Sequence, residues 1–186
     1  MNTKRRWLLI PTVLLPYIFV LAICTIIYAP DSALLASVME KVFDNNALYV
    51  LGIIVLFVLL SIVLSLLCFV MSICKKWDER TLAKTAMIIK LIQIPAYIFI
   101  FIVGVIMVFV PMGVLFVWVG CAFDYVILLL TGLISLSAIL NAVRRKMLEG
   151  KKCVWIIILQ FVFVADVVAT ILLYLKLRGN KKEICE

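Results

Sequence analysis

The stretch "VWIIILQFVFVADVVATILLYL" (154–175) decides how many times this chain crosses a membrane. Asp166 is its only formal charge. A membrane-spanning helix needs about 20 predominantly apolar residues, so the length of the stretch predicts a span over 153–175. An acid in the middle of such a span needs a polar partner, a proton or water, because a bare charge is costly in hydrocarbon.

The composition of the whole chain favours a membrane protein. Of the 186 residues, 67% are hydrophobic and 15% are charged, whereas soluble domains average about 45–50% and about 25%. A soluble core of this length could not hide so much apolar surface, so much of it must face lipid. We predict a single polytopic membrane domain over 1–186.

The apolar runs predict an all-α bundle of five transmembrane helices. The predicted spans cover about 7–29, 47–74, 85–110, 114–143 and 153–175, and "PMG" (111–113) makes a tight turn between the third and fourth. Apolar residues at helical spacing also predict a short interfacial amphipathic helix over about 32–43. Leu35 and Val42 should be shielded in it, and Glu40 should face water.

The distribution of Lys and Arg predicts orientation. Twelve of them lie in the N-terminal head and in loops 75–84 and 143–152, whereas loop 30–46 has only Lys41. Basic loops stay cytoplasmic, which places the N-terminus inside. Five spans then place the C-terminal tail outside, although it is also basic. Either the tail is an exception or the last segment does not span fully; its length favours five spans.

Several kinds of chemistry are disfavoured by the residue types present. The chain has no histidine, and its six cysteines form no C-x-x-C motif, so we expect no metal, no cofactor and no catalytic residues. The net charge of +8 lies in clusters between apolar runs, which indicates contact with an anionic leaflet of the lipid bilayer and not with nucleic acid.

Polar residues within the apolar runs predict a candidate site. Small and polar residues share one face of the fourth span around Asp124, and Gln93 and Tyr97 share a face of the third. Such faces commonly serve helix packing. Counting about 1.5 Å of rise per residue places Asp124, Asp166 and Tyr97 in one layer near the midplane. We therefore predict a shared polar pocket, with Gln93 and Thr170 flanking it. The alternative is that each acid only receives hydrogen bonds from its own separate neighbours. Lys90 falls some 15 Å below Asp124 by the same count and is expected to snorkel to the inner surface.

Two functions from different classes fit this pattern. The first is a small transporter, or a protein that binds a small molecule or cation, with its ligand held by Asp124, Asp166, Tyr97, Gln93 and Thr170. The second is a non-catalytic accessory or immunity-type protein that binds a membrane partner or a second copy within the bilayer. An intramembrane enzyme is the least favoured function, because only the paired acids point to it.

Two segments carry a resemblance. "KLIQIPAYIF" (90–99) and "ADVVATILLYLKL" (165–177) resemble a functionally uncharacterised family of small multi-spanning bacterial membrane proteins. The resemblance covers about the last hundred residues. It implies a multi-pass protein of a bacterial plasma membrane and says nothing about activity.

Overall fold

The computed structural model describes residues 7–28, 33–44, 46–111, 113–145, 147, 150–160 and 165–179, and within them every regular element is a helix. The elements are a short 3₁₀ helix, η1 (Trp7–Leu9), followed by α2 (Ile10–Tyr28), α3 (Ala33–Phe43), α4 (Ala47–Cys74), α5 (Glu79–Val108), α6 (Gly113–Arg144), α7 (Gly150–Leu159) and α8 (Ala165–Gly179). The all-helical class predicted from sequence is confirmed for these residues.

Four helices of the described chain are long and apolar enough to cross a membrane. They lie at Trp7–Thr25, Leu48–Cys74, Glu79–Val108 and Gly113–Arg144. Large apolar side chains on α4 are exposed along its length, including Leu51, Leu59 and Val70. This is the pattern of a helix that faces lipid, and it indicates a membrane protein.

Local sequence signals set the ends of α4 and α5. Asn46 caps α4 by accepting a hydrogen bond from the backbone N–H of Leu48 at 2.9 Å. Asp78 caps α5, accepting from the backbone N–H of Thr81 at 2.9 Å and from its hydroxyl at 2.6 Å. Side-chain oxygens at this position satisfy N–H groups that have no partner within the helix. The cap explains why α5 begins at Glu79 and not near residue 85.

The turn between α4 and α5 is a second determinant of the fold. Lys76 adopts a left-handed backbone conformation, with φ of 44°. The N–H groups of Trp77 and Lys76 donate to the carbonyls of Ser72 and Ile73, which is the Schellman pattern that ends many helices. Trp77 is thereby turned into the core, where it packs with Leu82 and Ala86.

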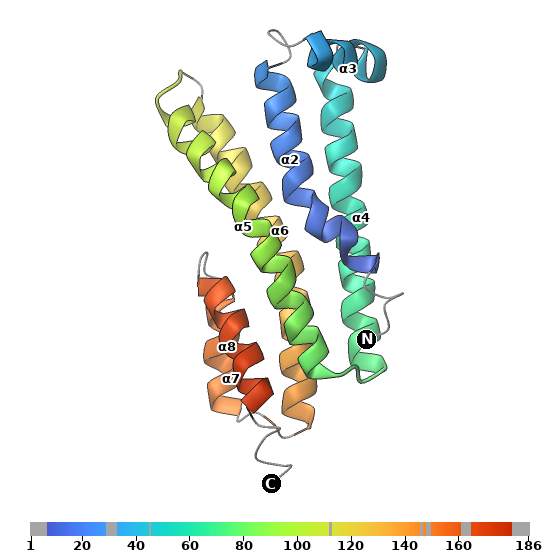
Figure 1. Ribbon diagram of the computed structural model, residues 1–186, viewed down its shortest axis with the longest axis vertical. Coiled ribbons are helices and arrows are strands. Elements are labelled where there is room, and N and C mark those ends of the chain that lie inside the picture. Colours follow the sequence, from blue (N-terminus) through green and yellow to red (C-terminus); the bar gives the residue numbers. More distant parts are fainter. Residues whose placement is uncertain are drawn as a thin grey trace.

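The helix pair α5–α6 forms the centre of the molecule (Figure 1). The two helices lie side by side along their length, and α2 and α4 flank them on one side. The tight turn predicted at 111–113 is where the pair reverses. A Cβ on Gly113 would approach the carbonyl oxygen of Met107 to 1.9 Å, so only glycine fits there.

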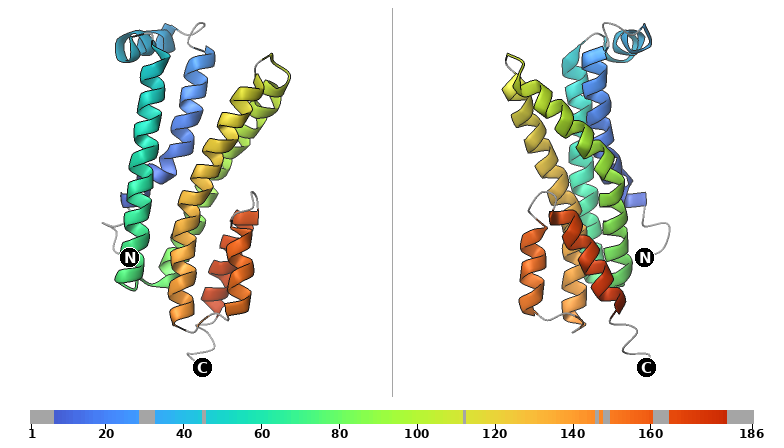
Figure 2. Two further views of the ribbon diagram at one scale, coloured as in Figure 1. Left: turned by 180° about the vertical axis from the view of Figure 1, so that it is seen from behind. Right: turned by 60° about the vertical axis from the view of Figure 1, so that its left-hand side comes forward.

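The apolar core is concentrated toward the end of the bundle that holds the α4–α5 turn. Its largest cluster joins residues of η1, α4, α5, α6 and α8, among them Leu9, Cys68, Leu82, Ile134, Ala138 and Leu173. A smaller cluster around Leu15, Ile127 and Leu130 lies further along α6. Beyond it, α5 and α6 lean away from α2 and α4 (Figures 1 and 2).

The predicted fifth span is corrected by the structure. The segment forms two helices, α7 of 10 residues and α8 of 15 residues, which lie side by side as a hairpin against α5 and α6 (Figure 2). Their lengths, about 15 and 22 Å, fall short of a hydrocarbon core of about 30 Å. The end of α8 consequently lies at the same end of the bundle as the α4–α5 turn, and not at the opposite end (Figure 1).

The segment predicted to be interfacial forms α3, which lies across the end of the bundle opposite the α4–α5 turn (Figure 1). Glu40 is exposed, as predicted. Val42 is 62% exposed, so the bundle does not shield it, and its contact with a membrane stays a prediction. The surroundings of Leu35 lie outside what the structure describes.

Candidate functional site

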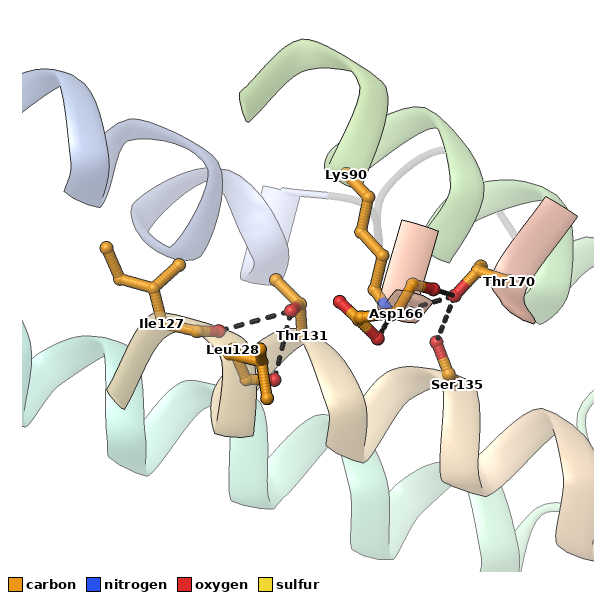
Figure 3. A network of polar contacts seen from close by, with 7 residues as sticks. All are labelled: Lys90, Ile127, Leu128, Thr131, Ser135, Asp166 and Thr170. Carbon is orange, nitrogen blue, oxygen red and sulfur yellow. Dashed lines mark hydrogen bonds and ion pairs between the residues drawn. The ribbon is translucent and has the colours of Figure 1, made fainter. Parts of the chain in front are cut away.

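Asp166, the acid in the stretch 154–175, is paired with Lys90 (Figure 3). Lys90 extends from α5 and is 2% exposed, and its Nζ donates to the Asp166 carboxylate and, at 2.8 Å, to the hydroxyl of Thr170. Thr170 lies one turn after Asp166 on α8 and donates to the Asp166 carbonyl at 2.8 Å. Ser135 of α6 approaches the Thr170 hydroxyl at 3.5 Å. We call Lys90, Ser135, Asp166 and Thr170 the α8 polar cluster.

The α8 polar cluster corrects the sequence prediction for Lys90. Lys90 does not snorkel to the surface; it is buried and neutralises Asp166. The count from sequence places Lys90 too near the inner surface because it starts the third span at residue 85, whereas α5 starts at Glu79, about 9 Å further down. In the hairpin, Asp166 begins the descending helix, about level with Lys90, which lies eleven residues into α5, or about 16 Å. The buried acid is tolerated because it has a cation and a hydroxyl as partners.

Asp124 and Tyr97 lie in different surroundings. Both line a cavity of about 950 Å³ bounded by α2, α5 and α6, whose lining also includes Phe19, Gly104 and Gly120. Nearly all of the other lining side chains are apolar. We call this space the α2–α5–α6 cavity. Its lining residues lie mainly in the second half of α5 and the first half of α6, the parts of these helices that diverge from α2 in Figure 1.

The carboxylate of Asp124 is the main polar feature of this cavity. Asp124 is 8% exposed, and its Oδ1 has no hydrogen-bond partner among the residues that the structure describes. Buried carboxylate oxygens are almost always hydrogen-bonded or paired, so an unsatisfied one beside a large cavity indicates a place for a donor group that the described residues do not supply.

The two acids do not line the same cavity, although both lie near enough to Tyr97 for their charges to act on it. Thr170, one turn after Asp166, lies beside Ser135, which follows Asp124 by eleven residues on α6, a rise of about 16 Å. The contacts of Asp166 are with Lys90 and Thr170, and the α2–α5–α6 cavity does not include it in its lining. Of the predicted site residues, the structure brings Asp124 together with Tyr97, and Asp166 together with Thr170.

Gln93 belongs to a third polar contact. It is fully buried, and its Nε2 donates to the backbone carbonyl of Thr12 at 2.8 Å. The Thr12 hydroxyl lies 3.0 Å from that of Ser65. This chain of bonds links α5 to α2 and α2 to α4, so Gln93 contributes to helix packing and does not line the α2–α5–α6 cavity.

The remaining site chemistry is limited in the described part of the chain. No group of three or more His, Cys, Asp or Glu residues lies close enough there to hold a metal ion. The sequence could have indicated Lys90 as the partner of Asp166, because these are opposite charges in two apolar runs and each needs neutralisation. The glycines lining the cavity carry no comparable signal.

Comparison with known proteins gives a family but no activity. No curated protein and no solved structure matches this chain. The model of one family matches residues 5–179, nearly the whole chain and well beyond the two segments that carry the resemblance. The uncharacterised family expected from sequence is thereby shown: the chain belongs to the family of unknown function DUF6652.

Proposed function

We propose that this protein binds, and as a transporter moves, a small amphiphilic molecule with a cationic or hydrogen-bond-donating group. The observation that carries the proposal is the unsatisfied Asp124 Oδ1 beside the α2–α5–α6 cavity. The volume of this cavity, about 950 Å³, lies within the range of about 300–1,000 Å³ that small-molecule sites occupy.

The chemistry of the cavity selects the ligand class. Its apolar walls suit a hydrocarbon or aromatic body, and one buried carboxylate suits one positive or donating group. A hydrogen bond to a charged group contributes about 1.5–3 kcal/mol, which corresponds to about 10- to 150-fold in affinity. Asp124 therefore supplies specificity for the head of the ligand, and the apolar lining supplies most of the buried area.

The setting of the protein is part of the proposal. We infer a plasma membrane, with the end that holds the α4–α5 turn facing the cytoplasm. Lys75, Lys76 and Arg80 lie at or beside that turn, and Arg144 and Arg178 lie at the ends of α6 and α8. Positive charges gather on the cytoplasmic side of membrane proteins. The helix α2 begins in this half of the bundle and runs away from it, so the N-terminus is then cytoplasmic.

A second function, an accessory protein that binds a partner helix, is favoured by one observation. Gly104 and Gly120 both line the α2–α5–α6 cavity, and a Cβ on either would meet nothing within 4 Å. Small residues let membrane helices approach closely. A helix from a second copy, presenting a donor to Asp124, would occupy the same space as the proposed ligand.

The test compares a lipophilic cation with a neutral analogue of the same apolar body, each titrated into the purified protein in mild detergent. Asp124→Asn should weaken binding of the cation by tenfold or more and leave the neutral analogue almost unchanged. Gly104→Leu should weaken both, because the side chain fills the cavity. Gly52→Leu is the matched control, since Gly52 is exposed on α4 and lies outside the cavity lining.

Equal binding of the cation by wild type and Asp124→Asn would refute the proposed ligand class. Light scattering of the same samples separates the accessory function from it. If a dimer is present and Gly104→Leu and Gly120→Leu convert it to monomer while neither compound binds, the cavity is a helix-binding surface.

A further inference from the structure

A second cavity lies at the end of the bundle that holds the α4–α5 turn. It has a volume of about 340 Å³ and is lined by Lys76, Asn141, Arg144 and Arg145. Three of these four residues are cations. We propose that this cavity binds a phosphate group, either that of an anionic phospholipid headgroup or that of a soluble phosphate compound.

The walls of the cavity are held in place by hydrogen bonds between α6 and the turn. Asn141 Nδ2 donates to the carbonyls of Ser72 and Trp77, each at 3.2 Å. Arg144 donates to the carbonyl of Ile73 at 3.3 Å, and Arg145 to that of Lys76 at 3.1 Å. Asn141 is buried and its amide bridges two carbonyls, so the backbone of the turn that carries Lys76 is held against the part of α6 that carries Arg144 and Arg145.

The charge balance around the cavity is positive. Arg145 is paired with Glu79 at 3.2 Å, and Asp78 lies close enough to Arg145 to feel its charge. Neither Lys76 nor Arg144 forms an ion pair with another described residue. Two cations are therefore available to an anion, and the Arg144 guanidinium retains N–H donors beyond the one bonded to Ile73.

The position of the cavity matches the ligand. It lies where α4 ends and α5 begins, at the boundary of two of the four candidate spans, which is the level of lipid headgroups when these helices cross a membrane. Basic pockets between helices at this level bind phosphate-bearing headgroups. This site is separate from the α2–α5–α6 cavity and does not depend on the function proposed for it.

The backbone conformation of Lys76 allows a variant that removes its charge without destabilising the turn. Lys76 holds a left-handed conformation, with φ of 44°, that glycine adopts without strain. Lys76→Gly removes one cation from the cavity and should raise thermal stability, so loss of binding in this variant cannot be attributed to unfolding. Lys75→Gln is the matched control, because it removes the neighbouring charge of the same turn from outside the cavity lining.

The experiment measures phosphatidylglycerol and phosphatidylcholine bound to the detergent-purified protein by native mass spectrometry, and the thermal stability with inorganic phosphate against sodium chloride of equal ionic strength. Phosphatidylglycerol should bind wild type and Lys75→Gln in preference to phosphatidylcholine. The affinity should fall about fivefold in Lys76→Gly and roughly 30-fold when Arg144→Gln is added.

The two sources of phosphate give different results. Stabilisation of wild type by inorganic phosphate, lost in the double variant, assigns the cavity to soluble phosphate compounds, and lipid binding without that effect assigns it to a headgroup. If the double variant and Lys75→Gln lose lipid equally, or if neither loses any and phosphate has no effect, the proposed site is overturned.

Discussion

The buried Lys90–Asp166 pair allows a quantitative test of how the α7–α8 hairpin is held. Replacing Lys90 by Met leaves the Asp166 carboxylate buried without its cation, and replacing Asp166 by Leu leaves the ammonium with only the Thr170 hydroxyl. Breaking a buried pair from one side costs about 3–5 kcal/mol, whereas replacing both partners by apolar residues is often neutral or stabilising. We expect each single variant to be strongly destabilised and the double variant to lie near wild type.

The magnitude of the coupling distinguishes charge pairing from ordinary packing. Hydrogen bonds between membrane helices average only about 0.6 kcal/mol, because the denatured chain in the membrane also finds partners. A coupling free energy above about 2 kcal/mol between positions 90 and 166 would therefore identify the charges as its source. Asp166→Asn should also destabilise the protein, because an amide keeps the volume but leaves the Lys90 charge without a counter-charge.

The assay is reversible unfolding in mixed micelles, followed by tryptophan fluorescence, for wild type, both single variants and the double variant. The pair Arg145–Glu79 supplies a comparison cycle, since the Arg145 side chain is 46% exposed although Glu79 is only 3% exposed; its coupling should be smaller than that between positions 90 and 166, because water screens the exposed guanidinium. If the double variant is as unstable as the two single variants summed, the pair does not act as a unit and the reasoning fails.

Two further predictions concern the ends of the helices. After the native cysteines are removed, a cysteine at Gly179 and one at Asp78 should react with an impermeant thiol reagent from the same side of sealed vesicles, and one at Asp44 from the other side. Labelling of positions 179 and 44 from the same side would mean that 153–175 crosses the membrane as a fifth span. Burial raises the pKa of Asp78, but hydrogen bonds from Thr81 and the charges of Arg145 and Arg80 outweigh it and lower the pKa below the usual value of an aspartate side chain. The cap is therefore fully effective above pH about 4 and is lost as the pH falls through the lower folded-state pKa. Asp78→Ala should cost about 1 kcal/mol at pH 7 and progressively less in unfolding titrations below pH 4, and a pH-independent difference would contradict this.

The four long helices could be predicted from sequence because the signal that forms them is local. Runs of apolar residues specify these helices without reference to the rest of the fold, but they do not give every limit: α5 starts at Glu79, six residues before the apolar run that predicts it, because Asp78 caps it there. The length of 154–175 predicts one membrane-spanning helix, which is wrong, because the mean hydropathy of a segment cannot distinguish one crossing from two shorter helices. The charge count contained the missing information: the basic tail that conflicted with five spans fits a hairpin whose end returns to the basic side.

The candidate site was only partly predictable for a related reason. Counting residues along a helix gives depth only when the start of the helix is known, and the apolar run places the start of the third span at residue 85, whereas the Asp78 cap starts α5 at Glu79. The six missing residues place Lys90, Tyr97 and Asp124 about 9 Å too near the inner surface, so the count pairs Asp166 with Asp124 and leaves Lys90 at the surface. Asp124 and Tyr97, both on continuous helices, were predicted together and line the same cavity.

The contrast between the two acids is the strongest argument for where function resides. Asp166 has a cation, a hydroxyl and a position in the first turn of α8, where a negative charge is favoured, and these contacts account for its presence without any ligand. Asp124 has an oxygen with no partner among the described residues, next to a cavity that the side chains leave open. Packing alone would be served better by an apolar residue there, since an unsatisfied buried polar group costs about 1–3 kcal/mol. A ligand that supplies the missing donor recovers that free energy on binding, which is why the search for a substrate begins at Asp124.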